Sequence, residues 1–162
     1  MKKKLIIIAT LIVLIISYMF FYKYTESNNL KLKNYARKVY NIANNINQSA
    51  KIIRYQPERE EYDMFKQQII TDLNSLGSAL YTGSSLISGI QINDNKIYIY
   101  TEKLYSELQD DNISPEIINI LDNIINATDV LVKNFEKCYS NDNNITRQEI
   151  INSIQTALIY IF

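Results

Sequence analysis

Two kinds of hydrophobic pattern divide the chain. An uncharged run from Leu5 to Tyr22 is apolar throughout, with Thr10 and Ser17 as its only small polar residues. From about residue 28 onward, apolar positions instead recur every three or four residues, as they do on one face of an α-helix. The pattern therefore predicts one apolar segment followed by a series of amphipathic helices.

The uncharged run has the length of a membrane span. A helix of about 18–20 residues covers roughly 30 Å, the thickness of the hydrocarbon layer of a bilayer. A cleaved secretory signal is the alternative, but its apolar region is shorter and ends in small residues; bulky Met19-Phe20-Phe21-Tyr22 stands there instead. We therefore expect residues 1–4 to be a basic leader, residues 5–24 an uncleaved transmembrane signal-anchor helix, and residues 25–162 a helical bundle domain.

Lysines on both sides of the run bear on its orientation. Lys2, Lys3 and Lys4 directly precede it, which favours an N-terminus inside the cell. Lys23 and a basic group within 31–38 follow it and favour the reverse orientation. Because the first group directly abuts the run, we expect a single-pass protein of the cell membrane whose soluble domain lies on the extracytoplasmic side.

Residues 28–56 predict the first helix of the bundle. Its apolar stripe has a 4-3 spacing and consists of Leu32, Ala36, Val39, Ala43, Ile46, Ala50 and Ile53. Pro57 ends this helix because the residue before a proline is pushed out of the helical region. The acidic run 58–63 suits the first turn of a second helix. That helix has the stripe Ile69, Leu73, Leu76 and Leu80 and is expected to stop between Tyr81 and Gly89.

Residues 89–101 allow two interpretations. The isoleucines on either side of Asn93-Asp94-Asn95 have the alternation and the turn of a β-hairpin. A helix capped at Asp94 or Asn95 would instead place Ile97, Thr101, Leu104 and Leu108 on one face. A two-stranded hairpin is marginal by itself, and the sequence offers no further strand, so we favour the helix.

The last two helices have clear start signals. Ser114 is a good N-cap and Pro115 takes the first helical position. The stripe that follows consists of Ile117, Leu121, Ile124, Thr128, Leu131, Phe135 and Cys138. Thr146 and Glu149 form a capping box for the final helix, whose stripe is Ile150, Ile154, Ala157 and Ile161. The chain is thus predicted to be all-α, a transmembrane helix followed by an antiparallel bundle of four or five helices; a bundle with a small β-hairpin at 89–101 is the alternative.

Composition removes most catalytic and metal chemistry. The chain has no His, one Cys and three Gly. It therefore lacks the residues of a Ser-His-Asp or Cys-His site, of a His-ligated metal site and of a glycine-rich phosphate loop. Cys138 lies on the apolar stripe, so we expect a buried thiol. We predict no catalytic residue, no metal site, no cofactor and no nucleic-acid partner; an enzyme that uses only carboxylate, Lys or Tyr chemistry is the alternative.

Charge is unevenly distributed although the chain has no net charge. Residues 23–56 contain seven basic side chains and one acidic, whereas residues 57–162 contain seven basic and sixteen acidic. One hypothesis is that the basic helix contacts anionic lipid headgroups or another polyanion. Its candidate binding residues are Lys31, Lys33, Arg37, Lys38, Lys51 and Arg54. The other hypothesis is that this helix packs against acidic neighbours within the bundle.

Tyrosines add a candidate contact surface. Tyr98 and Tyr105 are seven residues apart and, in the helical interpretation, share a face with Thr101. Such tyrosines either line a core or a groove, or contact a partner.

Together, these patterns favour a membrane-anchored, non-enzymatic helical domain that acts as a binding, sensor-like or structural module. Its expected partners are the lipid bilayer, through residues 5–24, and a protein. A concave face or an exposed apolar patch on the bundle would favour the protein partner. A membrane-active protein of the pore or lysis type is a further alternative.

Overall fold

The computed structural model describes residues 2–56, 58, 60–86, 94–108, 114–139 and 145–161 of the 162-residue chain. Side chains are described within these ranges at 12–56, 58, 60–83, 97–106, 108, 114–139 and 145–160. The elements are α1 (Lys2–Tyr55), α2 (Tyr62–Leu86), α3 (Asp94–Glu107), α4 (Pro115–Phe135), the short 3-10 helix η1 (Glu136–Tyr139) and α5 (Arg147–Ile161). Over these residues the chain is all-α and has no strand, which confirms the all-α part of the predicted fold class.

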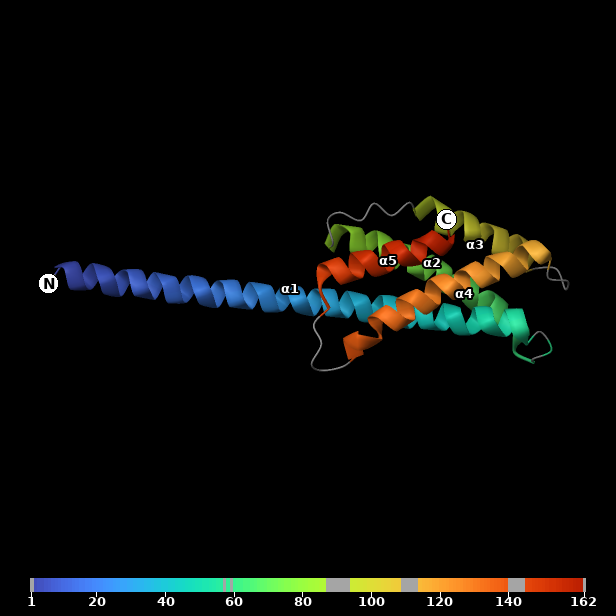
Figure 1. The fold of residues 1–162 in the computed structure, drawn as a ribbon, viewed down its shortest axis with the longest axis horizontal. Coiled ribbons are helices and arrows are strands. Elements are labelled where there is room, and N and C mark those ends of the chain that lie inside the picture. Colours follow the sequence, from blue (N-terminus) through green and yellow to red (C-terminus); the bar gives the residue numbers. More distant parts are fainter. Residues whose placement is uncertain are drawn as a thin grey trace.

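Helix α1 continues without a break from the apolar run into the bundle. It has 54 residues; its N-terminal part projects as a single rod, and its C-terminal part lies among the other helices (Figure 1). The described side chains from Ile12 to Ser27 are all exposed, and partial burial begins at Asn28. The predicted boundary between residues 24 and 25 therefore falls within one helix.

The expected transmembrane segment receives no support from the described residues. Over the described residues, none of the helices combines enough length with enough apolar character to cross a membrane. Residues 5–24 lie partly outside the described side chains, which begin at Ile12. The span therefore stays a prediction.

The predicted apolar stripes form the core of the bundle. Every stripe position of α1 from Ala36 to Ile53 is fully buried, and Leu32 is partly buried. The stripes of α2 and α4 are buried as well, from Ile69 to Leu80 and from Ile117 to Phe135. Helix α1 packs against both α2 and α4, while α3 packs against α2 and α5 against α4 (Figure 1). The heptad-like spacing thus identified the buried faces correctly.

Contacts between distant residues establish the antiparallel order. Tyr35 of α1 lies against Gly83, near the C-terminal end of α2. The Nε of Arg37 donates to the carbonyl oxygen of Cys138 at 2.9 Å. At the other end of α1, Arg54 pairs with Asp122. Helices α2 and α4 therefore both run antiparallel to α1, as predicted.

The caps of the last two helices form as predicted. The Oγ of Ser114 accepts a hydrogen bond from the amide of Ile117 at 3.3 Å. The amide of Thr146 donates to Glu149 Oε2 at 2.7 Å, and the amide of Glu149 donates back to Thr146 Oγ1 at 3.2 Å. These reciprocal bonds satisfy amide groups that have no partner inside the helix.

The helix ends near residues 55–63 agree with prediction only in part. Helix α1 ends at Tyr55, just before the predicted break at Pro57. Helix α2 begins at Tyr62, so Asp63 is the only acid in its first turn, and Glu58, Glu60 and Glu61 precede the helix. Helix α2 reaches Leu86, which is within the expected range.

The helical interpretation of the segment after Asp94 is correct. Residues 94–107 form α3, and Ile97, Thr101, Leu104 and Leu108 are all buried. Since the second strand of the alternative hairpin would need Ile97 and Ile99, that hairpin is wrong. Residues 89–93 lie outside the described part of the chain.

Candidate functional site

Half of the six basic residues predicted as a binding surface contact α4 or η1. Lys51 Nζ lies 3.0 Å from an oxygen of Asp129, and Arg54 Nε lies 3.1 Å from an oxygen of Asp122. Arg37 binds the carbonyl oxygen of Cys138, and its guanidinium lies 5.5 Å from the centre of the Tyr139 ring. For these three residues, packing against acceptors within the bundle accounts for the basic charge.

The other three residues lie on different parts of α1. Lys31 and Lys38 are exposed and, seven residues apart, share a face of the helix. Lys38 lines an open hollow between α1 and α2, together with Asp72. Lys33 is half-buried, and its charge acts on Cys138. The six residues therefore do not form one continuous patch.

Cys138 is buried, as predicted, in η1. Burial raises the pKa of its thiol, and the nearby charges of Lys137, Arg37 and Lys33 only partly oppose this effect. The thiolate is the nucleophilic form of cysteine. Cys138 is thus an apolar packing residue in this arrangement.

Polar side chains inside the bundle are used to join helices. Asn47, 7% exposed, directs its Nδ2 toward the carbonyl oxygen of Ile125 at 3.2 Å and toward oxygens of Thr128 and Asp129, each at 2.9 Å. These contacts connect α1 to α4.

Among the residues described, no group of three or more acidic or Cys side chains is arranged to hold a metal ion.

A groove follows the seam between α2 and α3. One hollow, of about 440 Å³, is lined by Leu73, Asn74, Gly77, Ser78, Tyr81, Thr82, Ile97 and Tyr98. A second hollow, of about 560 Å³, lies toward the start of α2 and is lined by Asp63, Lys66, Gln67, Ile70, Thr71, Tyr105 and Leu108. We refer to the two hollows together as the α2–α3 groove.

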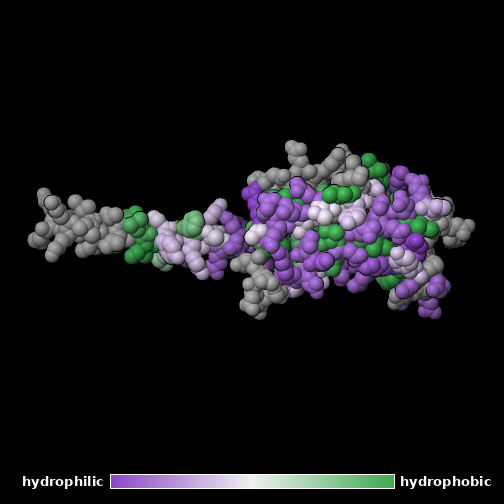
Figure 2. Space-filling view, viewed as in Figure 1, coloured by the Kyte–Doolittle hydropathy of each residue, from purple (hydrophilic) through white to green (hydrophobic). Residues whose placement is uncertain are grey.

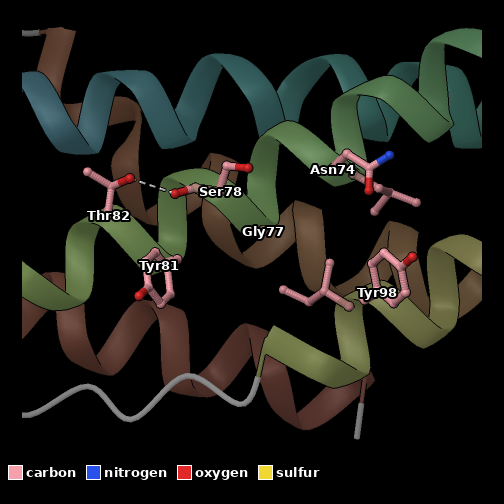
Figure 3. A pocket seen from close by; sticks show the side chains of 8 residues that line it. Asn74, Gly77, Ser78, Tyr81, Thr82 and Tyr98 are labelled. Carbon is pink, nitrogen blue, oxygen red and sulfur yellow. Dashed lines mark hydrogen bonds between the residues drawn. The ribbon is translucent and has the colours of Figure 1, made fainter.

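The first hollow has an apolar floor and aromatic sides. Gly77 contributes no side chain in the middle of α2, where a Cβ would lie 3.6 Å from Cγ2 of the buried Ile97. Tyr81 of α2 and Tyr98 of α3 stand on either side of it (Figure 3). These tyrosines are 68% and 60% exposed, so much of each ring is accessible to a ligand. Asn74 supplies an amide at the edge, where it can donate and accept hydrogen bonds.

The charge next to this hollow is negative. The hydroxyl of Tyr98 donates to the carboxylate of Glu102, which raises the pKa of the phenol. The residues that line the first hollow carry no formal charge. In the second hollow, Lys66 lies 3.6 Å from Asp63 and 4.8 Å from the centre of the Tyr62 ring.

The sequence identified only part of this groove. Tyr98 and Tyr105 line it, as one of the interpretations expected, but Thr101 is buried and lines neither hollow. The contribution of Gly77 and Tyr81 was missed. A glycine within an otherwise regular amphipathic helix was the available signal, but it does not reveal which helix packs beside it.

No model of a protein family, no curated protein and no solved structure matches this chain.

Proposed function

We propose that this chain is a membrane-anchored, non-enzymatic binding module. Residues 5–24 hold it in the cell membrane as a single-pass anchor, and the bundle presents its surface to a protein partner on the extracytoplasmic side. One observation carries the proposal: over residues 12–22, where its side chains are described, the projecting part of α1 is mainly apolar and exposed.

The described half of the apolar run supports an apolar environment around it. Ile12 to Ile16 are 47–61% exposed, and Met19, Phe20 and Phe21 are 55–73% exposed. Figure 2 shows this hydrophobic surface on the rod, at a distance from the mainly hydrophilic face of the bundle. Each 100 Å² of apolar surface in water costs about 2.5 kcal/mol, and helices that are apolar all round are normally covered by protein or by lipid. A bilayer would supply that cover.

The continuity of α1 limits which residues would reach the lipid. Asn28, where burial begins, follows Tyr22 by about 9 Å along a helix, so the bundle would sit close to the headgroups. Along the same straight helix Lys31 is about 14 Å beyond Tyr22, whereas Lys51 is about 44 Å beyond it. The Debye length is about 8 Å at physiological salt. Both distances exceed the Debye length, so screening weakens the contact for all six candidates. We keep the proposed contact with anionic lipid for Lys31 and Lys33, the two that lie nearest to the headgroups.

The lining of the groove supports a binding role over catalysis. A pair of carboxylates about 5–10 Å apart is needed for glycosidase-type acid–base chemistry. Each hollow of the α2–α3 groove has at most one carboxylate in its lining. Exposed tyrosines beside an apolar floor are instead typical of protein contact surfaces.

Flotation of the full chain with liposomes after alkaline extraction tests the anchor. We expect the wild type to float and the double variant Val13→Glu, Ile16→Lys to be released, because each charge costs about 2.5–3.5 kcal/mol at the centre of a span. Leu30→Lys is the matched control, since Leu30 is exposed on the same helix outside the apolar run. A wild-type chain recovered in the soluble fraction without residues 1–24 would overturn the anchor.

Labelling of intact cells tests the orientation. Gln155→Cys, in a chain that also carries Cys138→Ser, places one thiol on the exposed side of α5. An impermeant maleimide should label it without lysis. Labelling that appears only after lysis would place the bundle inside the cell.

A further inference from the structure

The two hollows of the α2–α3 groove have the spacing of two helical turns. Tyr98 lines the first hollow and Tyr105 lines the second. These residues are seven positions apart on α3, which corresponds to about 10.5 Å along the helix axis. A partner helix lying along the seam would present side chains at i and i+7 with the same separation. An extended chain would need a spacing of only about three residues.

The environment of the groove favours a basic partner. Residues 57–113, which contain α2 and α3, include ten acidic and four basic side chains. Two of those cations already have partners within the chain, since Lys66 pairs with Asp63 and Lys103 lies 2.9 Å from Glu116. Glu102 is an exposed carboxylate next to the first hollow, and the neutral hydroxyl of Tyr98 that donates to it leaves its charge uncompensated. A cation on the partner would therefore meet the Glu102 carboxylate beside the first hollow, whereas Asp63 and Lys66 in the second hollow pair with each other.

The same charge disfavours a second copy of this chain in the groove. Two copies that met through this groove in a symmetric contact would bring the same surface, with its Glu102 carboxylate, together from both sides. Like charges placed together across an interface cost several kcal/mol.

We propose that the α2–α3 groove binds one amphipathic helix of a partner protein. The apolar face of that helix carries two bulky side chains seven residues apart, one for each hollow, and its flanks carry Lys or Arg. Helices that dock into grooves are recognised through anchors with this kind of spacing. The inference names the partner class for the proposed binding module, and it does not depend on the membrane anchor.

A display library of helical peptides tests the proposal directly. The peptides have an Ala/Gln framework with randomised positions i, i+3, i+4 and i+7 and randomised flanks. The bait is the full chain in a mild uncharged detergent, which keeps it dispersed whether or not residues 5–24 span a bilayer. We expect enrichment of bulky apolar residues at i and i+7 and of Lys or Arg at the flanks. Enrichment of acidic flanks, of anchors three residues apart, or of no sequence at all would overturn the inference.

Variants of the groove show whether the selected peptides bind there. Gly77→Leu fills the first hollow, Tyr98→Ala removes an aromatic side chain from the first hollow, and Tyr105→Ala removes one from the second. Each variant should weaken the binding of the best peptide by about tenfold or more in fluorescence anisotropy. Glu102→Lys should weaken the binding of peptides with basic flanks and leave the binding of peptides with neutral flanks unchanged. Tyr55→Ala is the control, since Tyr55 is equally exposed at the end of α1, outside the residues that line the groove. Circular dichroism and thermal melting establish that each variant is folded.

The remaining outcomes separate the hypotheses. Unchanged affinity for folded Gly77→Leu would overturn the inference, as would a dimer in sedimentation that Gly77→Leu abolishes, because a second copy would then occupy the groove. Release of the chain from liposomes would contradict the proposed membrane anchor, but it would not affect the proposal that the groove binds a helix. Failure of the peptide selection would contradict the proposal that the groove binds a helix, but it would not affect the proposed membrane anchor.

Discussion

The ring of Tyr35 lies directly against the backbone of Gly83. A Cβ built on Gly83 would come within 2.1 Å of the Tyr35 hydroxyl oxygen and within 2.5 Å of a ring carbon. Glycine is therefore required at this crossing of α1 and α2, for reasons of space. The contact holds the C-terminal part of α2 against α1, at the end of the bundle nearest to the projecting rod (Figure 1).

Gly83→Ala should destabilise the bundle, whereas Gly77→Ala should stabilise it. The first substitution forces the Tyr35 ring to move, and overpacking of this kind costs about 1–3 kcal/mol. At Gly77 an added Cβ meets the Ile97 Cγ2 at an ordinary 3.6 Å, so the higher helix propensity of Ala contributes up to about 1 kcal/mol. Urea denaturation of both variants measures the two effects, and equal shifts would contradict the assigned contact.

Tyr35→Phe should stabilise the protein by about 1 kcal/mol. The Tyr35 side chain is 6% exposed, and its hydroxyl has no hydrogen-bond partner within the described residues. An unpaired buried polar group costs about 1–3 kcal/mol. Burial also raises the pKa of this phenol to about 12, so its neutral form supports folding fully below about pH 10 and this support is lost as the pH rises toward 12. Thermal melts at pH 7 and pH 11 should therefore show a larger gain for Phe at pH 11; lower stability of the variant at both values would contradict this account.

Asn47→Ala should cost about 1–3 kcal/mol, because it removes the amide that binds Ile125, Thr128 and Asp129 across the interface of α1 and α4. Asn45→Ala is the control, since Asn45 is exposed on the same helix, and its effect should stay within about 0.5 kcal/mol. Chemical denaturation compares the two variants. Similar losses for both would show that helix propensity, rather than the buried contact, determines the result.

Glu149→Gln should flatten the acid side of the stability profile. Hydrogen bonds from Lys137 and from Thr146 lower the pKa of the Glu149 carboxyl to about 2. A carboxyl whose pKa is lowered in the folded state stabilises the folded protein above about pH 4.5. This contribution to stability is lost as the pH falls toward 2. Gln can keep the capping bonds but not the charge, so the variant should lose about 0.5 kcal/mol at pH 7.

Melting temperatures between pH 2 and pH 7 measure this effect. The difference between wild type and Glu149→Gln should close near pH 2. Glu136→Gln is the control, since Glu136 is exposed in η1, and it should follow the wild-type profile. A difference for Glu149→Gln that does not vary with pH would contradict the role of the charge.

Local signals allowed most of the fold to be predicted. Apolar residues three and four positions apart identified the faces that are buried, from Ala36 to Ile53 in α1 and from Ile117 to Phe135 in α4. Ser114 and Glu149 marked helix starts because a cap satisfies amides within one turn of itself. The acidic run before α2 was the weaker signal, since a favourable charge near a helix N-terminus does not determine in which residue the helix begins.

The candidate site was only partly accessible to the same reasoning. Exposed tyrosines were found, but their neighbours were not, because Gly77 and Ile97 come from different helices. The six basic residues of α1 showed the same limitation. Whether Lys51 or Arg54 is paired depends on the position of Asp129 and Asp122 on α4, about 70 to 80 residues further along the chain.

The amino-acid sequence by itself determined the helices, their buried faces and the continuous apolar start of α1, because these depend on residues within a few turns of one another. Only the tertiary structure decided which cations are paired, where Tyr35 meets Gly83, and that a groove opens between α2 and α3. Those features depend on the side from which one helix approaches another. An apolar stripe determines which face of a helix is buried, but it does not determine which helix packs against that face.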